Sequence, residues 1–172
     1  MKLLTLIRHA KSSRAEPEQP DFLRPLDPRG LRDATAMGRY LDTTFRFSPD
    51  AIVSSPATRA ITTARLIADA IGSREWQIQQ DERIYEAPVS SLVEVIHDQS
   101  DKHSHVCLVG HNPGMENLTN WLCGMRAVED VVTCAVIMLE LDIPVWASAD
   151  MGKAKLREYL YPALIGLEKD FA

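Results

Sequence analysis

The chain has 172 residues, of which 45% are hydrophobic and 25% charged, and its formal net charge is −5. This length and balance fit one globular domain with a substantial core, which we expect to span residues 1–172. The negative charge excludes a general basic field that would attract nucleic acid or an anionic membrane surface. An anionic ligand would therefore have to be held by a local group of Arg and His side chains.

The three cysteines, Cys107, Cys123 and Cys134, are odd in number and show no CxxC spacing. Cys107 and Cys134 lie in apolar runs, so buried free thiols are expected rather than metal ligands or a catalytic thiol. The first apolar run, residues 3–7, is too short for a signal peptide or a membrane-spanning helix. We therefore expect a cytoplasmic, reduced protein.

The first half of the chain alternates strands with amphipathic helices. Residues 3–7 predict a buried strand, and the Pro-rich residues 16–28 predict a surface loop near its end. Asp27 and Pro28 are typical of a helix N-cap and its first position. Residues 51–54 predict a second strand, and Ser55-Pro56 predicts the start of a helix that stops at Gly72. The apolar faces of the two helices comprise Leu31, Ala34, Met37, Leu41 and Phe45, and Ala60, Ala64, Ile67 and Ile71.

The second half continues this alternation and then departs from it. Residues 76–78 predict a brief strand, Ser90 or Ser91 predicts a helix cap, and residues 106–109 predict another apolar strand. Residues 133–141 and 154–160 predict two strands without a helix between them. We therefore expect an α/β fold of three layers, α/β/α, with a mainly parallel sheet and an antiparallel C-terminal edge. The inner faces of the two helices in this half carry Leu92, Val95 and Ile96, and Met115, Leu118 and Leu122.

Basic side chains follow three of the predicted strands where each strand ends. Arg8 and His9 follow the first strand, Arg59 lies in the helix after the second, and His111 follows the strand at 106–109. Because parallel strands place their carboxyl ends at one edge of a sheet, we expect these side chains to converge there, beside helix N-termini that favour anions. Two arginines and two histidines fit a phosphoryl group, whose oxygens suit the arginines.

Each of these residues has an ordinary alternative when taken alone. Arg59 fits a solvated helix residue, and His111 fits a loop histidine in a Gly/Pro turn. Their joint occurrence at three strand ends favours the phosphate pocket. By contrast, His103 and His105 lie in a polar stretch that enters a strand, and we expect them to be solvated rather than metal ligands. We therefore expect no metal and no other cofactor.

The motifs at these positions resemble those of the histidine phosphatase superfamily, the group that contains phosphoglycerate mutases and many phosphatases. The matching segments are LIRHA at residues 6–10, LDPRG at 26–30, SSPATRAITTA at 54–64 and VGHNPG at 109–114. Within that group, the sequence RHAKS, the HNPG turn and the short chain look most like phosphohistidine phosphatases of the SixA type. The resemblance implies a phosphoglycerate mutase-like fold and one histidine phosphatase domain over residues 1–172.

The resemblance also implies roles for the pocket residues. His9 resembles the nucleophile that accepts the phosphoryl group, and Arg8 and Arg59 resemble the phosphate clamps. His111 resembles the second pocket histidine, which donates to a phosphoryl oxygen. Asn112, directly after His111, is a further candidate for substrate binding. These roles agree with the chemistry of the side chains, since a neutral imidazole is a nucleophile and the cations neutralise charge on the phosphoryl oxygens.

The proton donor to the leaving group is open at the level of the sequence. Residues 81–85 resemble the segment that supplies an acidic residue in phosphoglycerate mutases, and Glu82 occupies the matching place. Glu82 fits a charged surface loop equally well. An imidazole titrates near pH ~6.5 and leaves phosphorus more readily than an alkoxide. An enzyme that cleaves P–N bonds therefore tolerates a poorly placed acid.

The expected function is hydrolysis of a phosphoryl group through a phosphohistidine intermediate on His9, with a phosphohistidine-bearing protein as substrate. A short chain leaves few residues for a lid, and the resulting shallow pocket suits a side chain of another protein. The first alternative is a small-molecule phosphomonoesterase on the same fold, which would need a working acid. The second is a non-catalytic phosphate-binding module, which would have no need of the His9 nucleophile.

Overall fold

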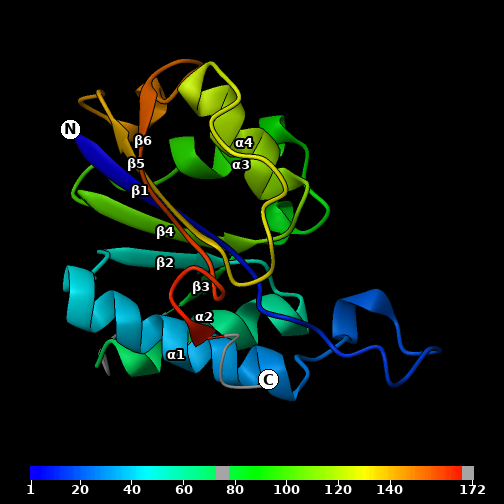
Figure 1. Ribbon diagram of the computed structural model, residues 1–172. Helices are drawn as coiled ribbons and strands as arrows, with labels where there is room; N and C mark the ends of the chain where they lie inside the picture. Colours follow the sequence, from blue (N-terminus) through cyan, green and yellow to red (C-terminus); the bar gives the residue numbers. More distant parts are fainter. Residues whose placement is uncertain (73–77, 168–172) are drawn as a thin grey trace.

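The computed structural model describes residues 1–72 and 78–167. At its centre is a six-stranded sheet with the strand order β3-β2-β4-β1-β5-β6 (Figure 1). Strands β1 to β4 pair in parallel, whereas β5 pairs antiparallel with β1 and with β6. The predicted parallel sheet with an antiparallel C-terminal edge is therefore confirmed. The strands are β1 Lys2–Arg8, β2 Ala51–Ser54, β3 Gln79–Gln80, β4 His105–Gly110, β5 Val136–Leu141 and β6 Ala154–Leu160.

Helices cover both faces of the sheet, which makes the three layers that the sequence predicts. Helices α1 (Pro28–Phe45) and α2 (Thr58–Ala70) pack on one face, and α3 (Val89–His97) and α4 (Gly114–Cys123) pack on the other (Figure 1). None of the helices in the described residues is long and apolar enough to cross a membrane. Three short 3-10 helices complete the set: η1 Asp21–Leu23, η2 Glu82–Ile84 and η3 Trp146–Ser148.

The central strands are largely apolar because most residues on both of their faces are buried. On β1, Leu4 and Leu6 join the core beneath α3 and α4, whereas Ile7 joins the core beneath α1 and α2. On β4, Leu108 and Val109 divide between the two cores in the same way. This alternation fixes the register of the central strands, because a slip of one residue would exchange the two faces.

Helix α1 begins where the sequence predicts. The Asp27 side chain accepts a hydrogen bond from the Gly30 N–H at 2.7 Å, and Pro28 occupies the first helical position. Gly30, not Leu31, is the buried residue of this turn, and a Cβ at residue 30 would lie 2.1 Å from the Lys11 carbonyl oxygen. Leu31 is 44% exposed, so its predicted place in the core is wrong.

Two helices begin elsewhere than predicted. Helix α2 starts at Thr58 rather than at Ser55-Pro56, because Ser55 still donates its N–H to the Val109 carbonyl and so extends the sheet. Helix α3 starts at Val89, without a side-chain cap, and Ser90 lies in its first turn. Neither helix start has a side-chain N-cap hydrogen bond, so candidate cap residues in the sequence predict both starts at the wrong positions.

The strand predicted at 133–141 begins only at Val136. Cys134 has a positive φ of 61°, and its N–H donates to the carbonyls of Arg8 and His9. The residues before β5 therefore form a turn against the end of β1 instead of extending the ladder. The strand predicted at 76–78 falls largely outside the described residues, and the described strand β3 directly follows Ile78.

His103 and His105 are partly buried, so the expectation that they are solvated is wrong. His105 opens β4, where its Nε2 lies 2.8 Å from the Thr5 hydroxyl and its ring meets the Phe47 ring edge-on. Burial lowers the pKa of His105 to about 4. The cysteines are free, as predicted, with Cys107 and Cys134 buried and Cys123 partly buried.

Replacing Gly30 by Ala should destabilise the fold, although helix propensity alone favours Ala over Gly by about 1 kcal/mol. The added Cβ would collide with the Lys11 backbone, and overpacking of this kind costs about 1–3 kcal/mol. Urea denaturation should show a loss of that size in the free energy of unfolding. Arg39→Ala, at an exposed position of α1, is the matched control and should change it by less than about 0.5 kcal/mol. A Gly30→Ala protein as stable as the wild type would contradict the close approach of α1 to Lys11.

Candidate active site

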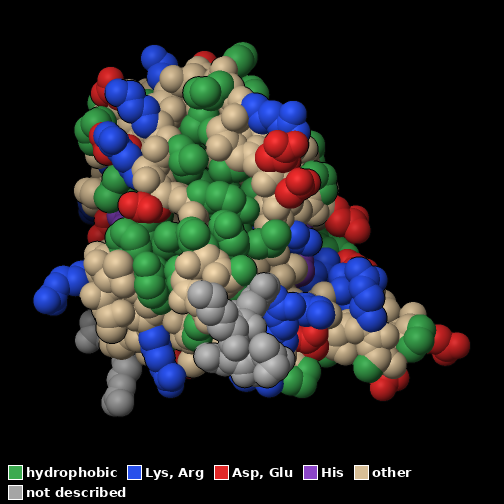
Figure 2. Space-filling model, viewed as in Figure 1, with side chains coloured by type: hydrophobic (Ala, Val, Ile, Leu, Met, Phe, Trp, Pro, Cys, Tyr) green, Lys and Arg blue, Asp and Glu red, His purple; other side chains and the backbone are tan. Residues whose placement is uncertain are grey.

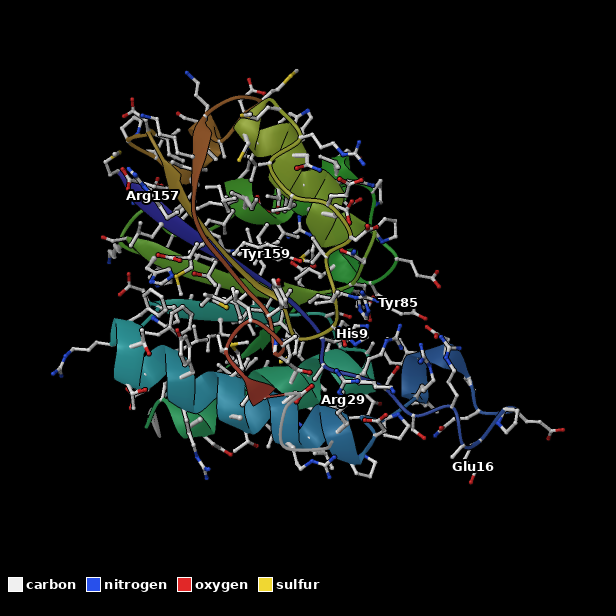
Figure 3. All side chains as sticks on the ribbon, viewed as in Figure 1. His9, Glu16, Arg29, Tyr85, Arg157 and Tyr159 are labelled. Atoms are coloured by element: carbon white, nitrogen blue, oxygen red, sulfur yellow. The ribbon has the colours of Figure 1, made fainter. Side chains whose placement is uncertain are left out.

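The sheet brings the ends of β1, β2 and β4 to one edge. Arg8 pairs with Gly110, and Ser54 pairs with Val109, so the residues that follow these strands emerge side by side. The His9 N–H continues the ladder by donating to the Gly110 carbonyl at 2.9 Å. Figure 3 labels His9 at this edge, where the segment that leads to α1 begins.

Hydrogen bonds to the two ring nitrogens define the tautomer of His9. Its Nδ1 lies 2.7 Å from the Ala10 carbonyl oxygen, which can only accept, so Nδ1 carries the proton. Its Nε2 accepts a hydrogen bond from Nε of Arg59 at 3.3 Å. Nε2 therefore carries a lone pair and no proton. This is the electron pair that a nucleophile needs, and it becomes available when Nε of Arg59 donates to another acceptor.

Burial keeps the His9 ring neutral. The side chain is buried, and this burial lowers the pKa of His9 to about 3 despite the hydrogen bond to Ala10. The nearby His111, Arg59 and Arg8 lower this pKa further by like-charge repulsion. A histidine with this pKa is unprotonated at neutral pH and needs no separate base before it attacks.

His111 faces His9 with the ring centroids 5.2 Å apart. Its Nε2 lies 2.8 Å from Oγ of Ser55, and that hydroxyl in turn accepts the Ala57 N–H. The Ser55 hydroxyl can donate to Nε2 while it accepts from Ala57, and this arrangement leaves the proton of a neutral His111 on Nδ1. Within the described residues this buried Nδ1 has no hydrogen-bond partner. It is a donor that a phosphoryl oxygen beside His9 would satisfy. Burial, followed by repulsion from Arg59, lowers the pKa of His111 to about 4.

Arg59 lies in the first turn of α2 and is buried. Besides donating to His9, its Nη1 donates to the Asp21 carbonyl oxygen at 2.7 Å, and its Nη2 donates to Oδ2 of Asp21 at 2.9 Å. A side-chain relay ties its helix to the His9 segment, because the Arg59 carbonyl accepts from the Thr63 hydroxyl, which accepts from the Ala10 N–H. The guanidinium is thus fixed beside His9 from two sides.

Arg8, the last residue of β1, donates from Nη1 to the Val131 carbonyl oxygen at 2.7 Å. Its Nε is buried and has no hydrogen-bond partner among the described residues. Burial lowers the pKa of Arg8, and the nearby Glu116 opposes that shift. Arg8 and Arg59 differ in this respect, since a carboxylate contacts the guanidinium of Arg59 directly.

The two remaining sequence candidates lie outside this group of contacting side chains. Asn112 lines the adjacent cavity, but its amide nitrogen donates to Val131 and Glu116 and its oxygen accepts the Glu116 N–H. Its amide therefore holds the start of α4 and the segment that contacts Arg8. Glu82 is exposed at the start of η2 and is not among the residues that line the cavity.

A cavity of about 430 Å³ adjoins the pocket. Arg59 and His111 belong to both, so the cavity lies where a group attached to the phosphoryl would extend. Figure 2 shows Lys and Arg side chains gathered beside a histidine at the edge where Figure 3 labels His9. The cavity is lined by Asp21, Arg59, Glu86, Ala87, Pro88, His111, Asn112, Pro113 and Gly114.

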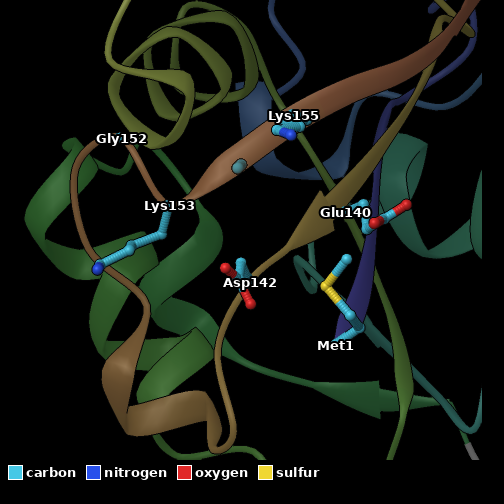
Figure 4. Close-up of a pocket in the computed structure, with 7 residues that line it drawn as sticks. Met1, Glu140, Asp142, Gly152, Lys153 and Lys155 are labelled. Atoms are coloured by element: carbon cyan, nitrogen blue, oxygen red, sulfur yellow. The ribbon is translucent and has the colours of Figure 1, made fainter.

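A second cavity of about 430 Å³ lies at the opposite end of the sheet, beside Met1 (Figure 4). Its lining includes Glu140, Asp142, Lys153 and Lys155, and it contains none of the site residues predicted from the sequence. The candidate catalytic and phosphate-binding side chains therefore lie at the end of β1 that leads to His9. In the described part of the chain, no group of three or more His, Cys, Asp or Glu residues could hold a metal ion.

Sequence reasoning missed three residues that shape the site: Ser55, Asp21 and Tyr85. Ser55 could have been identified from its place in the motif at 54–64, but the Ser-Pro pair instead indicates a helix start there. Asp21 lies in the Pro-rich segment interpreted as a surface loop. Only the folded structure shows that this segment contacts Arg59. Tyr85 lies three residues after Glu82, and its ring contacts His111 with centroids 5.4 Å apart.

Comparison with known proteins places this geometry in a family. The model of the histidine phosphatase superfamily (branch 1) matches residues 4–104, which is more than half of the chain. The chain belongs to the histidine phosphatase superfamily. The uncharacterized protein Rv1276c of Mycobacterium tuberculosis (strain H37Rv) is 34% identical over 128 residues, which cover 73% of this chain and 75% of that protein.

Solved structures show the same fold over nearly the whole length. One assigned as the phosphohistidine phosphatase SixA of Agrobacterium tumefaciens matches with a TM-score of 0.80 and 26% identity, over 94% of this chain and 98% of that one. The protein histidine phosphatase SixA complexed with tungstate matches with a TM-score of 0.81 and 18% identity, over 95% and 99%. The mycobacterial glucosyl-3-phosphoglycerate phosphatase Rv2419c with VO3 gives 0.70 and 16%, over 92% and 98%. The last two likenesses concern the fold.

Between pH 7 and pH 5 this histidine phosphatase family member should lose stability partly through His9. The pKa of His9 is about 3 in the folded protein and about 6.5 in an unfolded chain. In this window the unfolded state binds the extra proton, so stability falls as the pH falls, by about 2 kcal/mol for this group. Urea denaturation at both pH values should show that His9→Gln loses less stability than the wild type by about that amount. Equal losses would contradict a neutral, buried His9.

Proposed function

We propose that this protein is a phosphatase that transfers a phosphoryl group to Nε2 of His9 and then to water. The observation that carries the proposal is the unprotonated Nε2 of His9, which accepts from Arg59 and has His111 and Arg8 nearby. Arg59 already donates to this atom at 3.3 Å. Arg8 Nε and His111 Nδ1 are buried donors that lack a partner among the described residues. A phosphoryl dianion would supply acceptors to all three groups.

In the first step, the lone pair of Nε2 forms a bond to phosphorus in line with the leaving group. The bond from phosphorus to the leaving group breaks, and its electron pair departs with that group. Charge spreads over the three other phosphoryl oxygens, where the two guanidinium groups and the Nδ1 proton of His111 stabilise it. Arg8 Nε and His111 Nδ1 have no partner among the described residues to give up, so the one exchange is that of Arg59 Nε from Nε2 of His9 to a phosphoryl oxygen.

In the second step, a water oxygen forms a bond to phosphorus while the bond to Nε2 breaks. Inorganic phosphate departs as dihydrogen phosphate with both protons of the water, and His9 returns to its neutral form. The proton stays on Nδ1 of His9 and donates to the Ala10 carbonyl throughout, so the ring does not rotate between the two steps. The low pKa of His9 favours this release, because a weakly basic nitrogen is a good leaving group.

As substrate we propose a phosphohistidine side chain of another protein. The likeness to the A. tumefaciens structure assigned as SixA supports this class. Leaving-group chemistry supports it independently, since an imidazole departs from phosphorus with little help from an acid. Glu82, the acid suggested by the sequence, is exposed rather than directed into the cavity. A small-molecule phosphomonoesterase is the second candidate, because the cavity beside Arg59 could hold a small phosphorylated molecule.

Brief exposure to a 32P-phosphohistidine peptide, followed by an alkaline quench, should leave label on the wild type and none on His9→Ala. The label survives alkali because it sits on nitrogen, and it requires the Nε2 nucleophile. His103→Ala is the matched control, since this partly buried histidine lies at the other end of the sheet and should retain full labelling. Absence of label on both wild type and control would reject the covalent mechanism and favour a phosphate-binding module.

Glu82→Gln distinguishes the two substrate classes. For a phosphohistidine substrate, we expect kcat/KM to change by less than about threefold, since the imidazole leaves without an acid. An enzyme built for alkyl phosphates would lose about 10²-fold or more if Glu82 were its acid. Steady-state rates on a phosphohistidine peptide and on glycerol 3-phosphate measure both. A large loss on the peptide, or a strong wild-type preference for glycerol 3-phosphate, would reject the phosphohistidine assignment.

A further inference from the structure

Asp21 joins three side chains at the mouth of the pocket. Its Oδ2 accepts from Arg59 at 2.9 Å and from the Tyr85 hydroxyl at 2.6 Å, and its Oδ1 accepts from Arg24 at 3.0 Å. The ring of the neighbouring Phe22 packs edge-on against Tyr85 with centroids 5.2 Å apart. These contacts hold the segment that carries η1 at the mouth of the pocket, whereas the sequence predicts few residues that could cover the pocket.

These hydrogen bonds leave the side of Arg59 that faces His9 without contact to the carboxylate. A guanidinium has five N–H donors, and Asp21 takes one on Nη1 and one on Nη2. The Nε–H faces His9, and each Nη keeps a second donor. Asp21 can therefore hold Arg59 in place while Arg59 binds a phosphoryl oxygen next to His9. The contact with Asp21 therefore positions the Arg59 guanidinium without occupying the donors that would bind a phosphoryl oxygen.

The carboxylate of Asp21 stays charged throughout the working range of pH. The Tyr85 hydrogen bond, with those of Arg24 and Arg59, holds the pKa of Asp21 well below its usual range. The same contact raises the pKa of Tyr85 to about 12, so the phenol remains a donor. Because the Asp21 side chain is 48% exposed, its charge also faces the space that a substrate enters.

The cavity beyond Arg59 is acidic in its lining. Asp21 and Glu86 supply two carboxylates to this lining, and Arg59 supplies its guanidinium. Arg24 pairs with Oδ1 of Asp21 but does not line the cavity. Ala87 and Pro88 add apolar surface. This is the side on which the group attached to the phosphoryl would lie, because Arg59 and His111 line the cavity and also adjoin His9. A negative group there would face two like charges, while a cationic or neutral group would not.

We propose that Asp21 is a specificity-determining residue, which supports Arg59 and selects phosphoryl compounds whose attached group is cationic or neutral over those that carry a second anionic group. The proposal rests on the phosphatase assignment and narrows its substrate class. A protonatable imidazole or a basic peptide segment belongs to the favoured class. A phosphorylated carboxylic acid belongs to the rejected one.

Three small alkyl phosphates that differ in charge test this: phosphoethanolamine, glycerol 3-phosphate and 3-phosphoglycerate. Calorimetric binding to the His9→Ala protein, in which no ligand is consumed, gives their dissociation constants. We expect phosphoethanolamine to bind about tenfold more tightly than 3-phosphoglycerate, with glycerol 3-phosphate between them. Adding Asp21→Asn, which keeps an acceptor for Arg59 but removes the charge, should reduce the ratio to about twofold.

Glu16→Gln, also in the His9→Ala protein, is the matched control. It removes one carboxylate from the same segment, and Figure 3 shows Glu16 at the outer end of that segment, away from His9. The tenfold ratio should persist in this variant. An Asp21→Asn ratio equal to that of the control, or no binding of any of the three ligands, would overturn the proposal. The phosphatase assignment fails separately, through the absence of label on His9, because this binding test needs no turnover.

Discussion

Burial of His9 at the end of β1 is the constraint on which the rest of the site depends. Three backbone and side-chain contacts fix it: the ladder bond to Gly110, the bond from Cys134 to the His9 carbonyl and the Nδ1 bond to Ala10. Burial removes the proton from Nε2, and only then can the cations of Arg8 and Arg59 lie close without adding the repulsion of a third charge. The proposed nucleophile and the two proposed phosphate-binding arginines can therefore share one pocket.

The pocket and its mouth have opposite electrostatic characters. Beside His9, buried donors of Arg8 and His111 lack partners among the described residues, which is costly for folding and useful for binding a dianion. At the mouth, Asp21 accepts hydrogen bonds from Nη1 and Nη2 of Arg59 and carries a negative charge. The inner half can thus bind any phosphoryl group, while the outer half discriminates by what is attached to it.

Much of this arrangement is predictable from the sequence, because it follows from local rules. The apolar run that ends in Arg8 and His9 predicts β1, and Asp27-Pro28 predicts the start of α1, since both depend on neighbouring residues. The strand ends also place Arg59 and His111 at the same edge once the sheet is parallel. The likeness of the motifs then identifies the family.

The remainder depends on contacts between distant residues, which local patterns do not contain. Ser55 continues the β2 ladder through Val109, so a Ser-Pro signal places the helix too early. Asp21 reaches Arg59 across 38 positions, and nothing in its Pro-rich surroundings indicates that contact. The same holds for the turn at Cys134, whose positive φ is stabilised by the carbonyls at the end of β1.

A crystal structure of the protein with vanadate tests the central claim most directly. The account predicts vanadium bonded to Nε2 of His9, with its oxygens accepting from Arg8, Arg59 and Nδ1 of His111, and with Asp21 still on the outer atoms of Arg59. Vanadate bound away from His9, or held in the pocket without contact to Nε2, would contradict it.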